Sequence, residues 1–386
     1  MRRITLLAGL CLAATWARAE DTIKVGVVAP FSGPFADYGK EMETGIKAWQ
    51  KRHGELAGGK RIEVLLRDTT GPVPEIARRL AQELVVRDHV DFLAGFGLTP
   101  EALAAADVAT QADKPMIVMN AATSIITTKS PYIARVSMTL PQIASPLGTW
   151  AASHGIASVF TLVSDYGPGV DAEAAFTKAF TAAGGKVVDS VRVPLRNPEF
   201  SPFLQRIKDA APQAVFVFVP AGEQGIAFMK EFQERDLAQA GIRVIATGDL
   251  TDDEVLDAMG DAALGVVTAF HYSAAHDSPE NRDFLEAASA AGTGVKRPNF
   301  MAVAAYDGMA AIYHVVEELK GKVDGERAMK VLQGWSRQSP RGPITIDAAT
   351  RDVVQTVYLR RVEKRDGHYY NVEFDKVPEV KDPGKS

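Results

Sequence analysis

The chain has 386 residues, of which 46% are hydrophobic, and a formal net charge of −5. This length exceeds one ordinary core of about 100–200 residues, so we expect two lobes. An acidic chain without basic stripes cannot neutralise many phosphates, which excludes nucleic acid as an expected partner. Beyond the N-terminal segment described next, no run of about eighteen apolar residues occurs, so we expect no membrane-spanning segment.

Residues 1–19 have the pattern of a secretory signal peptide. A basic start, Met1–Arg3, precedes an apolar core from Ile4 to Ala14, and Ala17–Ala19 forms a small-x-small cleavage site. The apolar core is too short to cross a bilayer of about 30 Å as a helix. The single cysteine, Cys11, lies inside this segment. We therefore expect a cleaved, periplasmic chain that has no disulfides.

Short apolar runs then alternate with helix-period segments, which is typical of β-α units and a parallel sheet. In the first half the expected strands and helices are Ile23–Ala29, Tyr38–His53, Arg61–Arg67, a helix carrying Ile76, Leu80 and Leu84, Val90–Ala94, Pro100–Ala112 and Met116–Met119. In the second half they are Leu147–His154, Val159–Val163, Val170–Ala183, Val187–Val193, Phe200–Ala210, Ala214–Val219, Gly222–Arg235, Val244–Ala246, Gly265–Phe270, Asn281–Ala291 and Phe300–Lys320. The tail predicts an antiparallel hairpin, Thr356–Val362 with Tyr369–Phe374, around a turn at Arg365–Gly367.

This pattern predicts an α/β protein with two doubly wound lobes. Because no glycine- or proline-rich linker separates them, we expect the chain to cross between the lobes more than once, near Ser137, Phe270 and Gly342. The first lobe would then contain residues 20–137 and 271–341, and the second residues 138–270 and 342–386. Several crossings form a hinge that permits closing and restricts other motions.

In open parallel sheets, ligands bind beyond the carboxyl ends of strands, where loops lead into helices. Four such loops are candidates: residues 31–39, 95–100, 120–124 and 164–169. In the second loop, Thr99 is an expected N-cap and Pro100 suits the first turn, so free backbone amides would face an anion such as a carboxylate. The third loop adds the hydroxyls of Thr123 and Ser124, and the fourth adds Tyr166 from the opposite lobe.

Each of these features also has a purely structural explanation. Caps and glycines occur in strand-to-helix loops of any protein, and the combination of four loops is what favours a site in the cleft. Asp249 lies close enough to a strand end to reach a ligand, but together with Asp252–Glu254 it also suits a solvated helix start. We interpret Tyr306 as a core residue, with contact to the cleft as the alternative.

Other chemical motifs are weak or missing. The run Gly95-Phe96-Gly97 lacks the third glycine of a dinucleotide fingerprint. His271 and His276 have no third ligand nearby for a metal. The sequence contains no phosphate-binding loop ending in lysine, no Gly-x-Ser-x-Gly and no His-Glu-x-x-His. We therefore expect no cofactor, no metal and no catalytic group.

Several segments carry a family resemblance. The N-terminal signal pattern followed by "IKVGVVAPFSGPFADYGKEMETGIKAW", "FLAGFGLTPEALAAADVATQADKPMIVMNAATS", "VSDYGPG" and "GDAALGVVTA" resembles a periplasmic solute-binding protein of an ABC importer, of the leucine/isoleucine/valine-binding type. The resemblance covers essentially the whole mature chain. It implies the type I periplasmic binding fold, in which a ligand is clamped between two lobes joined by three crossovers and is delivered to a membrane permease.

The resemblance also implies a set of binding residues. The carboxylate site of the family falls on the side chain and amide of Thr99, the backbone of Ala121, and the amide and hydroxyl of Thr123. Tyr38 from the first loop and Tyr166 from the second lobe would cover the rest of the ligand. We expect further contacts from Phe35, Phe96, Ser124, Asp249 and Tyr306.

The sequence departs from the amino-acid-binding members at two places. Those members place an acidic residue after the strand that ends near Ala246, to receive the ammonium group, whereas here Asp249 is displaced by one position. The loop Pro220–Gln224 also lacks the expected cleft aromatic residue. Because a buried unpaired charge costs several kcal/mol, both changes favour the branch that binds aromatic carboxylates such as benzoate or phenylpropenoate derivatives.

We therefore expect a non-catalytic, monomeric receptor for a small aromatic carboxylate, with an ABC permease as its membrane partner. A branched-chain amino acid receptor of the same importer type is the alternative. More remote alternatives are an exported hydrolase that uses Asp249 or a histidine, and a sensor that passes its ligand to a signalling receptor.

Overall fold

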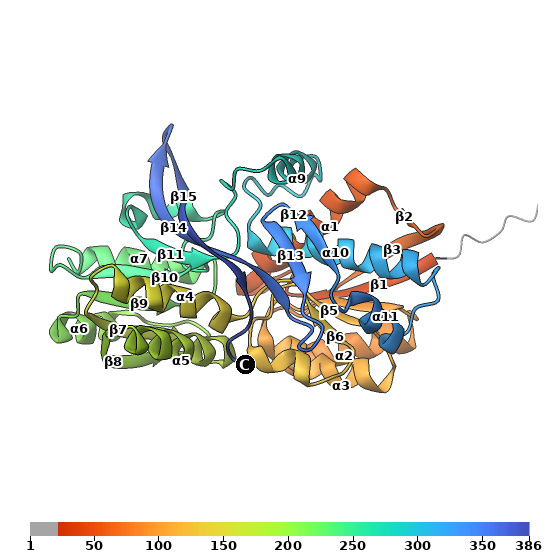
Figure 1. Ribbon diagram of the computed structural model, residues 1–386, viewed down its shortest axis with the longest axis horizontal. Coiled ribbons are helices and arrows are strands. Elements are labelled where there is room, and N and C mark those ends of the chain that lie inside the picture. Colours follow the sequence, from red (N-terminus) through yellow and green to blue (C-terminus); the bar gives the residue numbers. More distant parts are fainter. Residues whose placement is uncertain (1–21, 386) are drawn as a thin grey trace, which may run out of the picture.

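The computed structural model describes residues 22–385, so the predicted signal peptide lies outside the described residues. Two α/β lobes lie side by side, and long strands near the C-terminus run between them (Figure 1). Each lobe contains one sheet of mostly parallel strands. The predicted fold class is confirmed.

The first lobe is built on a six-stranded sheet in the order β2-β3-β1-β4-β5-β6. Its strands are β1 (Thr22–Ala29), β2 (Leu56–Ala57), β3 (Lys60–Asp68), β4 (Phe92–Gly95), β5 (Met116–Val118) and β6 (Ile133–Arg135). Its helices are α1 (Ala36–His53), α2 (Pro74–Val86), α3 (Thr99–Gln111), α10 (Phe300–Glu318) and α11 (Gly325–Leu332). Buried residues of α2 and α3 cover one face of the sheet, and those of α1 and α10 cover the other.

The second lobe has the larger sheet, in the order β12-β13-β14-β11-β10-β9-β7-β8, with β15 paired to β14. Its strands are β7 (Ser158–Ser164), β8 (Lys186–Val193), β9 (Ala214–Phe218), β10 (Arg243–Thr247), β11 (Val267–Phe270), β12 (Ser336–Ser339), β13 (Gly342–Ile346), β14 (Val353–Arg365) and β15 (His368–Val380). Its helices are α4 (Leu140–Ser153), α5 (Gly167–Ala182), α6 (Ser201–Ala210), α7 (Glu223–Glu234) and α8 (Leu256–Met259), while α9 (Pro279–Ser289) follows the second crossing.

The hairpin expected near the C-terminus is present, and both of its strands are longer than the sequence predicted. Asp366 and Gly367 form its turn with φ values of 50° and 84°. Two adjacent positive φ angles match the twist of a tight antiparallel hairpin. The additional residues of β15 are mostly exposed and polar, so the hydrophobic pattern could not mark them.

The chain crosses between the lobes at three places. The first crossing joins β6 to α4 and the second follows β11, close to the predicted positions Ser137 and Phe270. The third differs from the expectation near Gly342. Ser336–Ser339 pairs with β13 and so belongs to the sheet of the second lobe. The lobe boundaries expected from the sequence had assigned these residues to the first lobe.

A buried arginine ties these crossings together. Arg341 donates to Ser137 O at 2.9 Å and to Asp307 Oδ2 on α10 at 3.0 Å. It also donates to Gln355 Oε1 on β14 at 2.6 Å, and Gln355 in turn donates to Ser137 O at 2.9 Å. A single guanidinium group therefore joins the first crossing, the middle of α10 and β14, with its charge balanced by a buried carboxylate.

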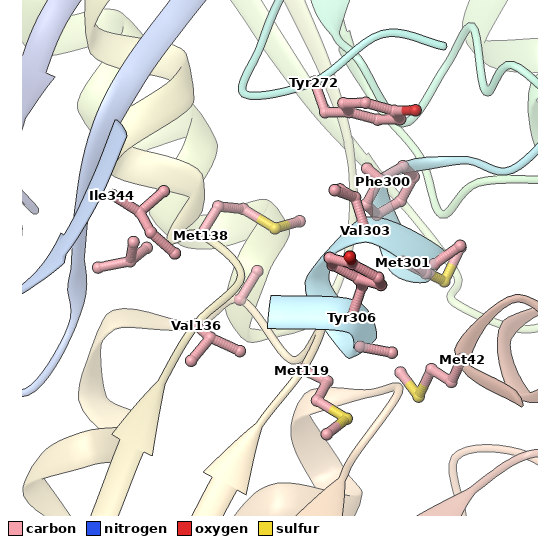
Figure 2. Close-up of a cluster of buried hydrophobic side chains, with 14 of the residues drawn as sticks. Met42, Met119, Val136, Met138, Tyr272, Phe300, Met301, Val303, Tyr306 and Ile344 are labelled. Carbon is pink, nitrogen blue, oxygen red and sulfur yellow. The ribbon is translucent and has the colours of Figure 1, made fainter. Parts of the chain in front are cut away.

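One apolar cluster extends from the first lobe through the hinge into the second lobe. Figure 2 shows side chains from both lobes and from the crossings meeting beside α10. The labelled residues are Met42, Met119, Val136, Met138, Tyr272, Phe300, Met301, Val303, Tyr306 and Ile344. Methionine fills irregular gaps well, which suits a region where several elements meet at different angles.

Candidate functional site

Two threonines from neighbouring strand ends meet in the first lobe. Thr99 is the first residue of α3, and Thr123 precedes a short 3-10 helix, Ser124–Thr128. Their Oγ1 atoms lie 2.8 Å apart, and both residues are buried. Two hydroxyls that share one hydrogen bond retain one proton for another acceptor.

The backbone amides beside these hydroxyls are available as well. Within residues 22–385, neither the Thr99 nor the Thr123 amide donates to a protein acceptor. The first amides of a helix have no partner inside the helix, and the positive end of the helix dipole favours an anion there. Two hydroxyls and two amides thus converge on one point that suits a carboxylate.

A buried glutamate holds the start of α3 in place. Glu101 accepts hydrogen bonds from Thr69 Oγ1 at 2.5 Å and from the Leu98 amide at 2.9 Å. Burial raises the pKa of Glu101 to about 7, while the bond from Thr69 acts in the opposite direction. The Glu101 side chain is therefore a fixed capping group. It accepts from the Leu98 amide and not from the Thr99 amide.

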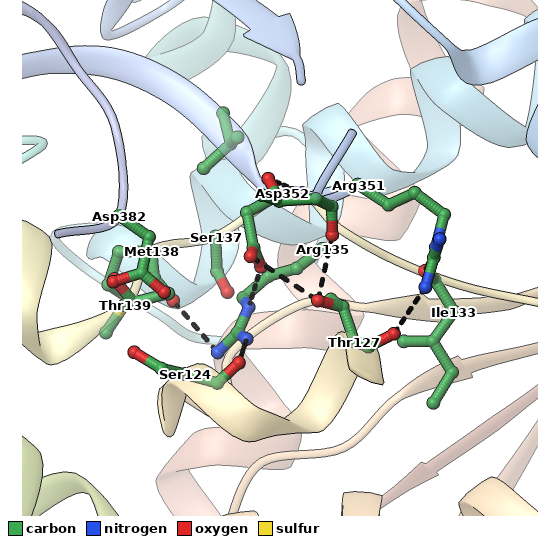
Figure 3. A network of polar contacts seen from close by, with 12 residues as sticks. Ser124, Thr127, Ile133, Arg135, Ser137, Met138, Thr139, Arg351, Asp352 and Asp382 are labelled. Atoms are coloured by element: carbon green, nitrogen blue, oxygen red, sulfur yellow. Dashed lines mark hydrogen bonds and ion pairs between the residues drawn. The ribbon is translucent and has the colours of Figure 1, made fainter. Parts of the chain in front are cut away.

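The loop that carries Thr123 is held by a second buried arginine (Figure 3). Arg135 Nη1 donates to Ala121 O and Thr123 O, each at 2.9 Å, and Nε donates to Asp352 Oδ1 at 2.9 Å. Asp352 is also paired with Lys385. Sequence reasoning did not find Arg135, although an arginine inside the apolar run "YIARVSM" is a signal that a buried charge needs a partner.

The backbone of Ala121 is already engaged by the protein. Its amide donates to Phe96 O at 2.9 Å and its carbonyl accepts from Arg135. Ala121 therefore shapes the loop, and only the second lone pair of its carbonyl remains for a ligand. Ser124 lies beside it and its amide donates to Asp171 Oδ2 on α5 at 2.9 Å, which makes it a contact between the two lobes.

The structure places Phe96, which we expected to stack against a ligand, in the hydrophobic core. Phe96 has a φ of 64° and is completely buried among core residues of α3 and the sheet, including Val28, Ala102 and Val118. The left-handed backbone conformation turns its side chain toward the face of the sheet that α2 and α3 cover. A phenylalanine at a strand end therefore belongs to the core in this protein.

Tyr306 is likewise buried in the core, which agrees with the first of our two interpretations. Its ring packs edge-on against Trp49 at 4.9 Å and Phe284 at 5.2 Å, and its hydroxyl lies 3.2 Å from His53 Nε2. These partners come from α1 and α9. Tyr306 thus joins helices of the first lobe and does not lie beside Thr99 and Thr123.

Tyr38 and Phe35 lie together at the cleft, on the first loop. Their rings pack edge to face with centroids 5.4 Å apart, and both residues are buried. A Cβ added at Gly97 would lie 3.3 Å from Tyr38 Cδ2, which places the ring beside the loop that leads to Thr99. Burial raises the pKa of Tyr38, and Tyr166 and Asp249 raise it further, while the backbone of Ala221 in the second lobe lowers it.

The second lobe brings Tyr166 to the same place. Tyr166 precedes α5 and stacks on Phe218 with centroids 6.0 Å apart and a 24° angle between the rings. A Cβ added at the next residue, Gly167, would lie 2.5 Å from Thr123 Oγ1. Only glycine allows the second lobe to approach the first so closely, so the lobes meet directly at the threonine pair.

Asp249 follows β10 and is buried. It accepts a hydrogen bond from Thr247 Oγ1 at 2.8 Å. Burial raises the pKa of Asp249 to about 6, whereas the bond from Thr247 and the charge of Arg360 lower it. The negative charge of Asp249 in turn contributes to the raised pKa values of both Tyr38 and Tyr166.

The second lobe has a further buried carboxyl group at Asp252, close to Glu41 of the first lobe. Asn299 Nδ2 donates to both oxygens of Asp252, at 3.0 and 3.1 Å, and the Asn299 amide donates to Glu41 Oε2 at 3.1 Å. Burial, followed by the charge of Asp253, raises the pKa of Asp252 to about 7. The acidic cluster is therefore buried rather than the solvated helix start considered above. Within the described residues it forms no set of three ligands suited to a metal.

Comparison with known proteins places the chain in a family. A family model described as periplasmic binding protein matches residues 22–367. The chain belongs to this family. A Leu/Ile/Val-binding protein homolog 6 from Brucella melitensis is 48% identical over 99% of this chain and 98% of its own length. Across residues 22–385, no helix is long and apolar enough to cross a bilayer.

Solved structures of the same family are similar along the whole length. A solute-binding protein of an ABC transporter from Rhodopseudomonas palustris BisB5, in complex with 3,4-dihydroxybenzoic acid, is 54% identical with a TM-score of 0.92, over 95% of this chain and all of that one. Another from R. palustris, in complex with 4-hydroxybenzoate, is 43% identical with a TM-score of 0.92, over 94% and 99% of the two chains.

Proposed function

We propose that this periplasmic binding protein is the extracytoplasmic receptor of an ABC importer and that it binds a small aromatic carboxylate between its lobes. The observation that carries the proposal is the pair Thr99 and Thr123, whose hydroxyls and free amides form a cation-free anion site. The relatives crystallised with hydroxylated benzoates support an aromatic ligand. We infer that its partner is a membrane permease, that it acts as a monomer and that it has no catalytic role.

In this proposal each lobe binds one end of the ligand. The carboxylate accepts hydrogen bonds from Thr99 and Thr123, and the ring lies between Tyr38, Phe35 and Tyr166. Tyr166 belongs to the second lobe and contacts the ligand only when the lobes are closed. A ligand shifts the equilibrium toward the closed form only through such state-specific contacts.

A branched-chain amino acid is the weaker candidate. Its ammonium group would need a charged carboxylate placed to receive it, and the candidate, Asp249, already accepts a hydrogen bond from Thr247 and is harder to charge than an exposed carboxyl because burial raises its pKa to about 6. A buried ammonium group without a charged partner would cost several kcal/mol. The name of the Brucella relatives supports this alternative only through overall similarity.

A thermal-shift panel of benzoate, 4-hydroxybenzoate, leucine and valine tests the proposal. At a hundred times its dissociation constant, a ligand stabilises the protein by about 2.7 kcal/mol, which is visible as a rise in melting temperature. We expect the aromatic acids to produce this rise and the amino acids to produce none. A rise with leucine alone would replace the proposal by its alternative.

A further inference from the structure

A separate chamber lies between the lobes, outside the threonine pair. It has a volume of about 490 Å³. The first lobe contributes Phe35 and residues 70–73 to its wall, and the second lobe contributes residues 195–198, Phe200, Ala221, Gln224 and Ala227. Ligand pockets in proteins typically measure about 300–1,000 Å³, so the chamber is large enough for part of an organic molecule.

The chamber has the chemistry of a binding site for a neutral group. Phe35 and Phe200 are buried and give it aromatic walls. Gln224 Nε2 donates to Leu195 O at 2.9 Å, which fixes the amide, while its Oε1 atom is buried and has no partner within residues 22–385. A fixed, buried acceptor without a donor favours a ligand hydroxyl.

The charges at the chamber do not favour a second carboxylate. Arg196 lines it, but its guanidinium group already donates to Pro72 O in the first lobe at 3.0 Å. Glu223 lines the same chamber with a negative charge. The two opposite charges lie on one wall, so an uncharged group that donates a hydrogen bond fits better than an anion.

Tyr38 stands between this chamber and the threonine pair. Phe35 belongs to the chamber wall and packs against the Tyr38 ring, with centroids 5.4 Å apart. A Cβ added at Gly97, on the loop that leads to Thr99, would lie 3.3 Å from Tyr38 Cδ2. The Tyr38 ring therefore adjoins both the chamber wall and the loop of the carboxylate site.

We propose that the chamber receives the far end of an elongated ligand, an aromatic acid extended by a second ring that ends in a hydroxyl group. The carboxylate would bind at Thr99 and Thr123, the second ring would lie between Phe35 and Phe200, and its hydroxyl would donate to Gln224 Oε1. This inference rests on the proposed function, because it needs the carboxylate to be held at the threonine pair.

Calorimetry with three probes tests the inference: 4-hydroxybenzoate, biphenyl-4-carboxylate and 4′-hydroxybiphenyl-4-carboxylate. We expect all three to bind to the unaltered protein. Ala227→Phe places a ring in the chamber from α7, and we expect it to weaken both biphenyl acids about tenfold while 4-hydroxybenzoate changes less than about twofold. Ala210→Phe, on an exposed position of α6 in the same lobe, is the control and should change none of the three.

A second variant tests the hydroxyl contact separately. We expect the unaltered protein to prefer the hydroxylated biphenyl acid over the plain one by about fivefold, and Gln224→Met to remove this preference. Equal effects of Ala227→Phe on short and long ligands would overturn the inference, as would biphenyl acids that fail to bind while 4-hydroxybenzoate binds. Failure of all three to bind to the unaltered protein would instead overturn the proposed function, and the inference with it.

Discussion

At the cleft, the segments that follow the strands of the first lobe present free amides and hydroxyls. The corresponding segments of the second lobe present an aromatic ring and buried carboxyl groups. Thr99 and Thr123 carry no charge and can donate, while Asp249 and Asp252 can only accept unless they are protonated. We therefore expect an anion to bind favourably to the first lobe alone. The second lobe can contribute stacking by Tyr166, but it repels a carboxylate that approaches from the wrong end, so the comparison predicts the orientation of the ligand as well as its class.

The largest expected effect comes from removing the support beneath the first-lobe site. Arg135→Met would remove the guanidinium donor of the Ala121 and Thr123 carbonyls and would leave Asp352 with Lys385 as its ion-pair partner. Breaking a buried ion pair on one side is strongly destabilising, and we expect a loss of about 3 kcal/mol in the free energy of unfolding. Urea denaturation measures it. Arg351→Met, which removes bonds to loop carbonyls but no direct bond to Asp352, should lose less.

One hydrogen-bond donor of the first-lobe site, the Thr123 hydroxyl, can be removed by a single substitution. Thr123→Val keeps the shape of the side chain but loses a hydroxyl that donates to a charged group, and we expect binding of 4-hydroxybenzoate to weaken by about 1.5–3 kcal/mol. Isothermal calorimetry measures it. Thr110→Val is the matched control, because the Thr110 hydroxyl is on an exposed residue of α3 and donates to Ala106 O within the same helix at 3.0 Å. Unchanged affinity in the Thr123 variant would exclude this residue from the site.

The contribution of the second lobe can be tested at Tyr166. Tyr166→Ala removes the ring that meets the ligand only in the closed form, and we expect weaker binding by about 1–2 kcal/mol together with less ligand-driven compaction. Calorimetry and small-angle scattering measure the two effects. Tyr166→Phe retains the ring and should retain compaction. Normal compaction in the alanine variant would show that another contact closes the cleft.

The smallest effect concerns the buried acid of the second lobe. The pKa of Asp252 is raised to about 7 in the folded protein, so the folded state favours its protonated form. Its contribution to stability is therefore present below the unfolded pKa of about 4 and is lost as the pH rises toward 7. Relative to the unaltered protein, we expect Asp252→Asn to gain about 2 °C in melting temperature between pH 5 and pH 8.

Subtracting the melting temperature of the unaltered protein at each pH isolates the effect of Asp252. Burial lowers the pKa of His271, which has the opposite influence on stability in the same range, but His271 is present in both proteins. Its contribution cancels in the difference. A difference in melting temperature that stays constant from pH 5 to pH 8 would mean that Asp252 is already charged in the folded protein.

The sequence was sufficient to predict the fold class and most elements, because alternating strands and amphipathic helices leave a strong pattern. The threonine pair could be expected for the same reason, since parallel strands end at one edge of a sheet and bring their loops together. Phe96 and Tyr306 were less certain, because the same residue types line cores and clefts. Their orientation depends on a left-handed φ at Phe96 and on the packing of α1 and α9, which local pattern does not reveal.

Contacts between distant parts of the chain could not be predicted. Arg135 and Asp352 are separated by 217 positions, and their pairing depends on how the C-terminal strands return through the hinge. The third crossing was placed too late for a related reason. Ser336–Ser339 is a short strand with exposed polar residues, so only its pairing with β13 reveals which sheet it joins.

The Arg341 cluster has a consequence for how the molecule moves. Its guanidinium group joins the first crossing, β14 and the middle of α10 to one another. We expect these bonds to persist at every angle between the lobes, so that opening exposes no unpaired polar atom at the axis. The free-energy difference between the open and closed forms would then arise from contacts in the cleft alone. The transporter would recognise ligand binding as a nearly rigid rotation of one lobe about a fixed hinge.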